Sequence, residues 1–132
     1  MGIFDLFRSK SERQKLSHLK ALVALSLADG TVEKSELAAI AAICQREGIS
    51  ESDLKKCLEN PESIDFVPPT DHATKVRYLQ DMVCLMMCDG NIDDNEFAVC
   101  KLTAEALGFR HEIIDAMILD IIAELQKTIK NS

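Results

Sequence analysis

The sequence predicts an all-α protein, a pseudo-twofold helical bundle of six or seven helices made from two helix-turn-helix repeats. Three observations lead to this fold class. The 132 residues include only five glycines and three prolines and are rich in good helix formers. Apolar residues recur at three- and four-residue spacing along most of the chain, which is the period of one helix face. The sequence also matches itself when it is shifted by 60 residues.

The internal match runs without a gap through two glycine-ended turns. The shift aligns residues of the same kind at matching positions: Asp29-Gly30 with Asp89-Gly90, Leu19 with Leu79, Val23 with Val83, Glu36 with Glu96, and Gly48 with Gly108. We therefore expect one domain over residues 1–132, with residues 1–11 as an N-terminal arm. Its repeat halves, at about 12–60 and 71–129, should cover each other's apolar faces.

Three helices are expected in the first half. Ser11 is a suitable N-cap for a long first helix, and Gly30 allows the chain to leave that helix in a left-handed conformation. Gly48 ends the second helix in the same way, and Ser50 caps a short third one. The expected ranges are about 12–29, 34–47 and 51–59. The buried face of the first helix should consist of Leu16, Leu19, Leu22, Val23 and Leu27.

A proline-containing connector over residues 60–70 precedes the second half. We expect Ile64, Phe66 and Val67 to pin this connector to the core. Three further helices follow, from residue 70 or 71 to about Asp89, over 94–107 and over 111–129. The inner face of the last helix should carry Ile114, Met117, Ile118, Ile121, Ile122 and Leu125.

The charge is acidic and uneven. The formal net charge is −7, although residues 1–20 carry +3, so the remainder carries −10. Because contacts to phosphate need a basic patch, the body of the domain does not fit a nucleic-acid binder. Two interpretations stay open for the arm, whose apolar stretch is followed by basic residues. It packs on the domain, or it makes peripheral contact with a membrane or a partner.

The chain is expected to be cytoplasmic. No apolar run reaches the ~18 residues that a membrane helix needs, and the N-terminus does not resemble a signal peptide. The five cysteines should therefore be reduced thiols. Cys84 and Cys88, four residues apart on one helix, could ligate a soft metal, but packed thiols are the favoured interpretation for them and for Cys100.

The two acidic turns share the pattern Asp-Gly-x-(Val/Ile)-x-x-x-Glu. This pattern matches the second half of a calcium-binding EF-hand loop, with glycine at position six and glutamate at position twelve. The first ligand positions of such a loop would fall on residues that cannot ligate calcium: Leu25, Leu27, Leu85 and Met87. The sequence therefore excludes a genuine EF-hand and leaves a shallower oxygen site open.

Two interpretations of these acids remain. Glu33 and Asp93 can act as N-caps with Glu36 and Glu96 three residues later, which is a purely helical role. An aspartate in the last turn of a helix, however, is disfavoured by the helix dipole, and that suggests a compensating backbone N–H or a cation. The candidate ligands for a divalent cation such as Ca, Mg or Mn are Asp29, Glu33, Glu36, Asp89, Asp93 and Glu96.

The paired turns resemble those of the TerB-like family of tellurite-resistance-associated proteins. The residues that carry this resemblance are Ala28–Leu37, Cys88–Phe97 and the opening Met-Gly-Ile-Phe-Asp-Leu-Phe, and the similarity extends from about Leu16 to Leu125. It implies an all-helical fold, divalent-cation binding by the acids at 29, 36, 89 and 96, and a role in bacterial stress-response complexes. Similar domains occur in a membrane-anchored J-domain co-chaperone, which implies protein partners. Lys34 departs from the family pattern and would weaken a cation site in the first turn.

No catalytic constellation is expected. His18, His72 and His111 are scattered, and the isolated glycines do not form a phosphate-binding loop. The leading hypothesis is a non-enzymatic acidic module that binds divalent cations at its turns and protein partners on its faces. The alternative is a metal-free adaptor for protein-protein interaction whose turn acids are only helix caps. The oligomeric state stays open.

Overall fold

The computed structural model describes residues 8–28 and 30–131. They form α1 (Lys10–Leu27), α2 (Lys34–Glu47), α3 (Glu51–Glu59), the 3₁₀ turn η2 (Pro61–Ser63), α4 (His72–Met87), α5 (Asp94–Ala106) and α6 (Glu112–Lys130). These two ranges contain six α-helices and no strand, so the predicted all-α class is confirmed. Residues 1–7 of the expected N-terminal arm, with their expected membrane or partner contact, lie outside the described residues, as does Asp29.

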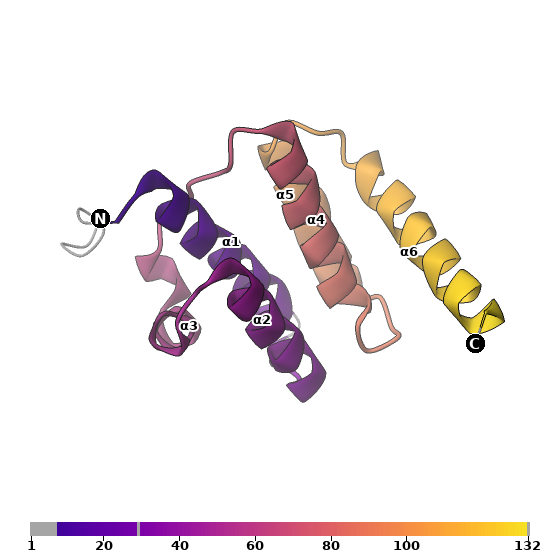
Figure 1. The fold of residues 1–132 in the computed structure, drawn as a ribbon, viewed down its shortest axis with the longest axis horizontal. Helices are drawn as coiled ribbons and strands as arrows, with labels where there is room; N and C mark the ends of the chain where they lie inside the picture. The colour runs from indigo at the N-terminus through magenta and orange to yellow at the C-terminus, as the bar shows by residue number, and fades with distance from the viewer. Residues whose placement is uncertain (1–7, 29, 132) are drawn as a thin grey trace.

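Helices α1 and α4 form the centre of the bundle (Figure 1). α1 packs against α2, α3, α4 and α5, whereas α4 packs against α1, α2, α5 and α6. α3 and α6 lie at opposite edges of the view in Figure 1. The two central helices supply most of the fully buried large side chains, which include Leu19, Leu22, Leu25, Leu79, Met82 and Leu85. Burying each such side chain contributes roughly 1.5–3 kcal/mol, so these two helices supply most of the apolar burial that stabilises the fold.

Local caps begin the helices, and the first one differs from the prediction. The N–H of Glu12 donates to Ser9 Oγ at 3.1 Å, so Ser9 caps α1 and the assignment to Ser11 is wrong. Ser9 and Glu12 have the Ser-x-x-Glu spacing of a capping box, whereas Ser11 lies inside the first turn. The predicted cap of α3 is confirmed, because the N–H of Asp53 donates to Ser50 Oγ at 3.1 Å.

α1 and α4 end two residues earlier than predicted, at Leu27 and Met87. The reason is local. The N–H of Cys88 bonds back three residues to the carbonyl of Leu85 at 3.3 Å, which tightens the last turn of α4. Gly90 then adopts a φ of +85°, a conformation that side-chain-bearing residues rarely take. The sequence predicted Asp89 in the last turn of α4. In the structure Asp89 lies beyond the helix, in the turn that follows it.

Two apolar segments are less buried than predicted. The connector is held by Ile64 and Val67, whose backbone groups bond Lys20 Nζ and Ser17 Oγ, but Phe66 is 57% exposed. On α6, Ile114, Met117 and Ile118 are buried as expected, whereas two residues assigned to the same inner face, Ile122 and Leu125, are 38% and 56% exposed. Helical periodicity identifies an apolar face, but it does not show how far the rest of the bundle extends along that face.

None of the described helices combines the length and the apolar character that crossing a membrane requires.

Candidate functional site

The second acidic turn is held by its own carboxylates. Asp89 Oδ1 accepts the N–H of Asn91 at 3.0 Å. Asp93 Oδ1 accepts the N–H groups of Asn95 at 2.9 Å and of Glu96 at 3.1 Å, which makes Asp93 the N-cap of α5. Backbone donors therefore compensate both aspartates, which is the role that the capping interpretation assigns to them.

The first turn follows the same scheme where it is described. Glu33 is the N-cap of α2, and its N–H donates to Glu36 Oε1 at 3.2 Å in a capping box. Glu36 and Glu96, the third residues of α2 and α5, are only 2% and 4% exposed. The expected placement of Glu33, Glu36, Asp93 and Glu96 at helix starts is confirmed. Asp29 lies outside the described residues.

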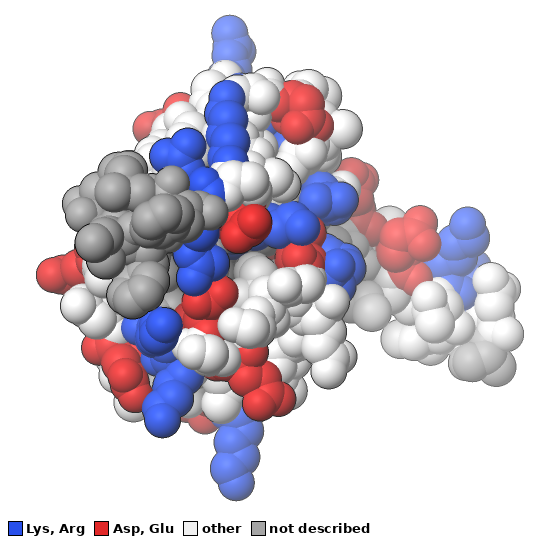
Figure 2. Space-filling view, turned by 60° about the vertical axis from the view of Figure 1, so that its left-hand side comes forward, with Lys and Arg blue, Asp and Glu red and all other residues white. Residues whose placement is uncertain are grey.

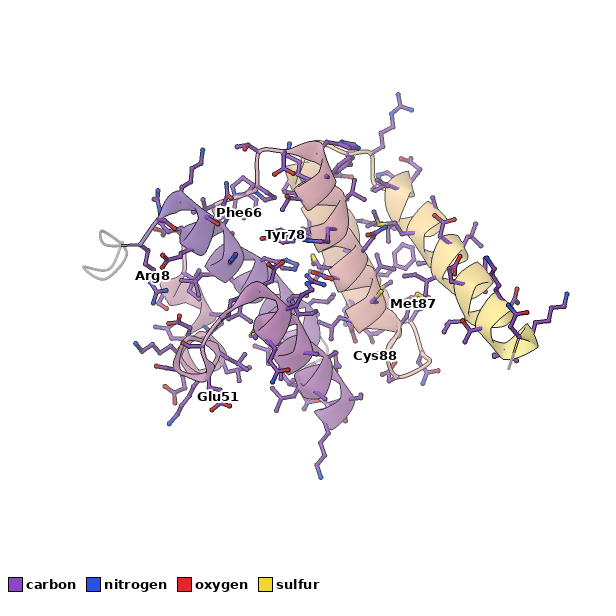
Figure 3. The ribbon with its side chains drawn as sticks, viewed as in Figure 1. Arg8, Glu51, Phe66, Tyr78, Met87 and Cys88 are labelled. Carbon is purple, nitrogen blue, oxygen red and sulfur yellow. The ribbon has the colours of Figure 1, made fainter. Side chains whose placement is uncertain are left out.

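Acids from both turns lie around one thiol at the end of α4. The pKa of the Cys88 thiol is raised first by its partial burial and then by the negative charges of Glu36, Asp89 and Glu96, against a hydrogen bond to Ser35 that lowers it. Cys88 Sγ lies 3.9 Å from Ser35 Oγ, so this thiol bridges the end of α4 and the start of α2. Figure 3 shows Cys88 at the end of α4, next to the turn. Folding thus brings the two turns, which are 60 residues apart in the sequence, to the same end of the bundle.

Within the described ranges, however, no three His, Cys, Asp or Glu side chains are grouped so that they could hold a metal ion. The candidate ligands Glu33, Glu36, Asp89, Asp93 and Glu96 therefore do not by themselves form a coordination site. Asp29, the remaining candidate, is not among the described residues.

A buried polar network joins α1, α2 and α4, and sequence reasoning missed it. His18 Nε2 lies 2.8 Å from Asp81 Oδ2, and its ring stacks on Tyr78 with the centroids 3.8 Å apart. Arg46 Nη1 donates to Asp81 Oδ1 at 2.9 Å, and Arg46 and Arg77 both donate to Glu47. Figure 3 shows Tyr78 between α4 and α1. An aspartate in the middle of the apolar segment 78–87 was the one available signal, because a charge there needs a buried partner.

The carboxylate of Asp81 is only 10% exposed, yet its interactions favour the charged form. Burial alone would raise the pKa of Asp81, but the hydrogen bonds from Arg46 and His18 outweigh burial and hold the pKa below its ordinary value. The network thus links α1, α2 and α4 through paired charges, and removing one partner would leave a buried charge without compensation.

A groove of about 460 Å³ opens between α4 and α6, beside this network. Its floor carries four apolar or weakly polar side chains: Cys84, Met117, Ile121 and Leu125. One rim carries Arg46 and Arg77, which are about half exposed and paired with Asp81 and Glu47. The other rim is acidic, with Asp120 and Glu124. The lining thus combines apolar side chains with charged edges.

The cysteines are free, as expected, but two of them are not packed as predicted. Cys44, Cys57 and Cys100 are buried, and burial raises the pKa of Cys57 to about 11 and that of Cys100 to about 12. Cys84 and Cys88 are exposed, so their assignment as packed thiols is wrong. Cys84 faces the groove, which other helices leave open.

The surface charges are mixed where they can be followed. Figure 2 shows basic and acidic side chains interspersed on the face that it draws, with no continuous basic patch on that face. Comparison with known proteins adds no assignment, since no family model, no curated protein and no solved structure matches the chain.

Proposed function

We propose that the protein is a non-enzymatic helical interaction module of the cytoplasm, related to the TerB-like stress-resistance proteins, and that it binds a protein partner in the groove between α4 and α6. The observation that carries the proposal is the groove itself. It has an apolar floor between a basic and an acidic rim. An amphipathic helix with charges at both edges has the chemistry that fits this lining.

The arrangement of the polar groups supports a role without catalysis. His18 stacks on Tyr78 and is hydrogen-bonded to Asp81, which it shares with Arg46. A general base needs an open position beside it for a reacting atom, whereas this histidine side chain is only 2% exposed. The network instead holds the groove wall in place, because Asp81 and Arg46 both line the groove.

We also propose that the two halves are repeats of one unit. A smaller hollow of about 260 Å³ lies on α1 and α5, and Phe66 of the connector partly lines it. Five residues of the groove are related by the 60-residue shift to five residues of this hollow: Arg46 to Ala106, Arg77 to Ser17, Gln80 to Lys20, Asp81 to Ala21, and Cys84 to Ala24. Three of these positions are charged in the groove, at Arg46, Arg77 and Asp81, whereas the hollow carries one charge among the five, at Lys20.

Position-specific cross-linking tests the groove. Leu125, on its floor, is replaced by the photo-crosslinking residue benzoylphenylalanine in cells that express the protein. Leu119, which lies on the same helix but does not line the groove, serves as the control; it is 67% exposed. Cross-links from position 125 but not from 119 support the proposal. Equal cross-linking from both positions, or none from 125, contradicts it.

Binding of a divalent cation at the turns is the second candidate function. Its support is that carboxylates of both turns, Glu36, Asp89 and Glu96, lie near Cys88 at the same end of the bundle, although the described side chains are not grouped as a metal site. Oxygen ligands of this kind suit calcium, magnesium or manganese. Isothermal titration with manganese tests this candidate. Saturable heat at one or two ions per chain supports it, and the absence of binding at millimolar ion leaves the acids as caps.

A further inference from the structure

We infer that the occupant of the groove is α6 of a second copy of this chain, paired antiparallel about a twofold axis. The inference rests on the proposed function for the groove and names its partner. It starts from α6 itself. Beyond Ile118 none of the described residues of α6 is buried, and the exposed Leu125 lines the groove. Three further exposed apolar residues of this part do not line the groove: Leu119, Ile122 and Ile129.

The face of α6 that lines the groove has the spacing of a coiled-coil seam. Met117, Ile121, Glu124 and Thr128 line the groove at intervals of four, three and four residues, which are the a and d positions of a heptad. Asp120 and Leu125 line the groove on the two sides of that seam. One heptad beyond Asp120, on the same side, stands Lys127.

These two flanking charges select the orientation. In an antiparallel pair, flanking positions on the same side of the seam face each other across the twofold axis. Asp120 of each copy therefore faces Lys127 of the other copy, and two opposite-charge contacts form. The other side of the seam brings Ile118 next to Leu125 of the second copy, an apolar contact that covers the exposed part of Leu125. A parallel pair would instead place Asp120 near Leu125, with no charge to meet it.

The remaining seam charge also has a counterpart. Glu124 lies on the seam, and the opposite rim of the same groove carries Arg46 and Arg77, each about half exposed. When a second α6 lies in the groove, its Glu124 comes toward this basic rim. A second copy thus matches the floor, both flanks and the rim, whereas an unrelated helix would have to match this charge pattern independently.

Sedimentation velocity over a concentration series tests the inference, with the full chain and no added partner. We expect a monomer–dimer equilibrium. Asp120→Lys alone and Lys127→Glu alone should each weaken dimerisation about tenfold, which corresponds to about 1.4 kcal/mol, because both symmetric contacts become repulsive. The double variant exchanges the charges and should restore the wild-type affinity. Both positions are exposed, so the fold should tolerate these changes.

A second pair of variants tests the face. Leu125→Lys should abolish the dimer, and Leu119→Lys should leave it intact, with circular dichroism showing that both remain helical. A monomer at every concentration up to about 1 mM overturns the inference, and so does a double charge variant that stays as weak as the single ones. Cross-linking from position 125 to a different protein, with no dimer in sedimentation, overturns the second copy as occupant and leaves the proposed function standing.

Discussion

The carboxylate of Asp81 is expected to hold the three-helix network together, and Asp81→Ala removes it. Two kinds of loss follow. His18 has a side chain only 2% exposed and loses the partner at 2.8 Å, which costs roughly 1–3 kcal/mol for a buried polar group. Arg46 is 44% exposed and can turn to water or to Glu47, so its share is about 1 kcal/mol or less. We expect Asp81→Ala to lower the free energy of unfolding by about 2–4 kcal/mol.

Urea unfolding at neutral pH, followed by circular dichroism, measures this loss, and a double-mutant cycle with Arg46→Ala separates the network from packing. Because the two side chains share hydrogen bonds, the double variant should be less destabilised than the sum of the single ones, by about 1 kcal/mol. Glu59→Ala is the control, since an exposed acid that does not line the groove should change stability by less than about 0.5 kcal/mol. A loss below about 0.5 kcal/mol for Asp81→Ala, or strict additivity with Arg46→Ala, would refute the reasoning.

Three further predictions concern the pH response, the turns and the cation. Because the folded-state pKa of Asp81 is lowered, its contribution to the free energy of unfolding is present above the ordinary aspartate pKa of about 3.9 and is lost as the pH falls through the folded-state value. The free energy of unfolding of Asp81→Ala, measured by urea titration, should therefore fall less steeply than that of the wild type between about pH 5 and pH 2. Gly90→Ala should lower the free energy of unfolding by about 1–2 kcal/mol, because φ is +85°, and the backbone conformation is the only source of this cost since an added Cβ meets no atom within 4 Å. An unchanged melting temperature would contradict this. For the second candidate function, calcium at a hundredfold excess over Kd should stabilise the wild type by about 2.7 kcal/mol, and the double variant Asp89→Asn with Glu96→Gln should lose that gain. Melting curves that coincide with and without calcium would leave the acids as caps.

Much of the fold follows from local signals in the sequence. The starts of α2, α3 and α5 could be predicted because capping residues act within a few positions of themselves, as Ser50, Glu33 and Asp93 do. The ends of α1 and α4 were placed two residues too late, because a tightened last turn leaves no mark in composition. The first cap was assigned to the wrong serine, since Ser9 with Glu12 and Ser11 with Gln14 both fit the spacing of a capping box.

The candidate site was less accessible to sequence reasoning. The acids of the turns were found because they repeat, and their caps follow from spacing. The Asp81–His18 pair joins residues 63 positions apart that no repeat relates, so only the fold could bring them together. The groove depends on where the bundle stops covering α6. Periodicity treats Ile118 and Leu125 alike, although the structure buries the first and leaves the second 56% exposed.

The labelling rate of Cys84 tests most directly the claim that the groove is a binding surface. Cys84 lies on the groove floor, while Cys88 is exposed at the C-cap of the same helix, outside the groove. The ratio of their alkylation rates therefore reports groove occupancy with an internal control. Iodoacetamide labelling is compared between dilute purified protein and intact cells, with each site quantified by mass spectrometry. The account predicts that the ratio of Cys84 to Cys88 labelling falls in cells, because a bound helix covers the floor. The same ratio in both settings would contradict it.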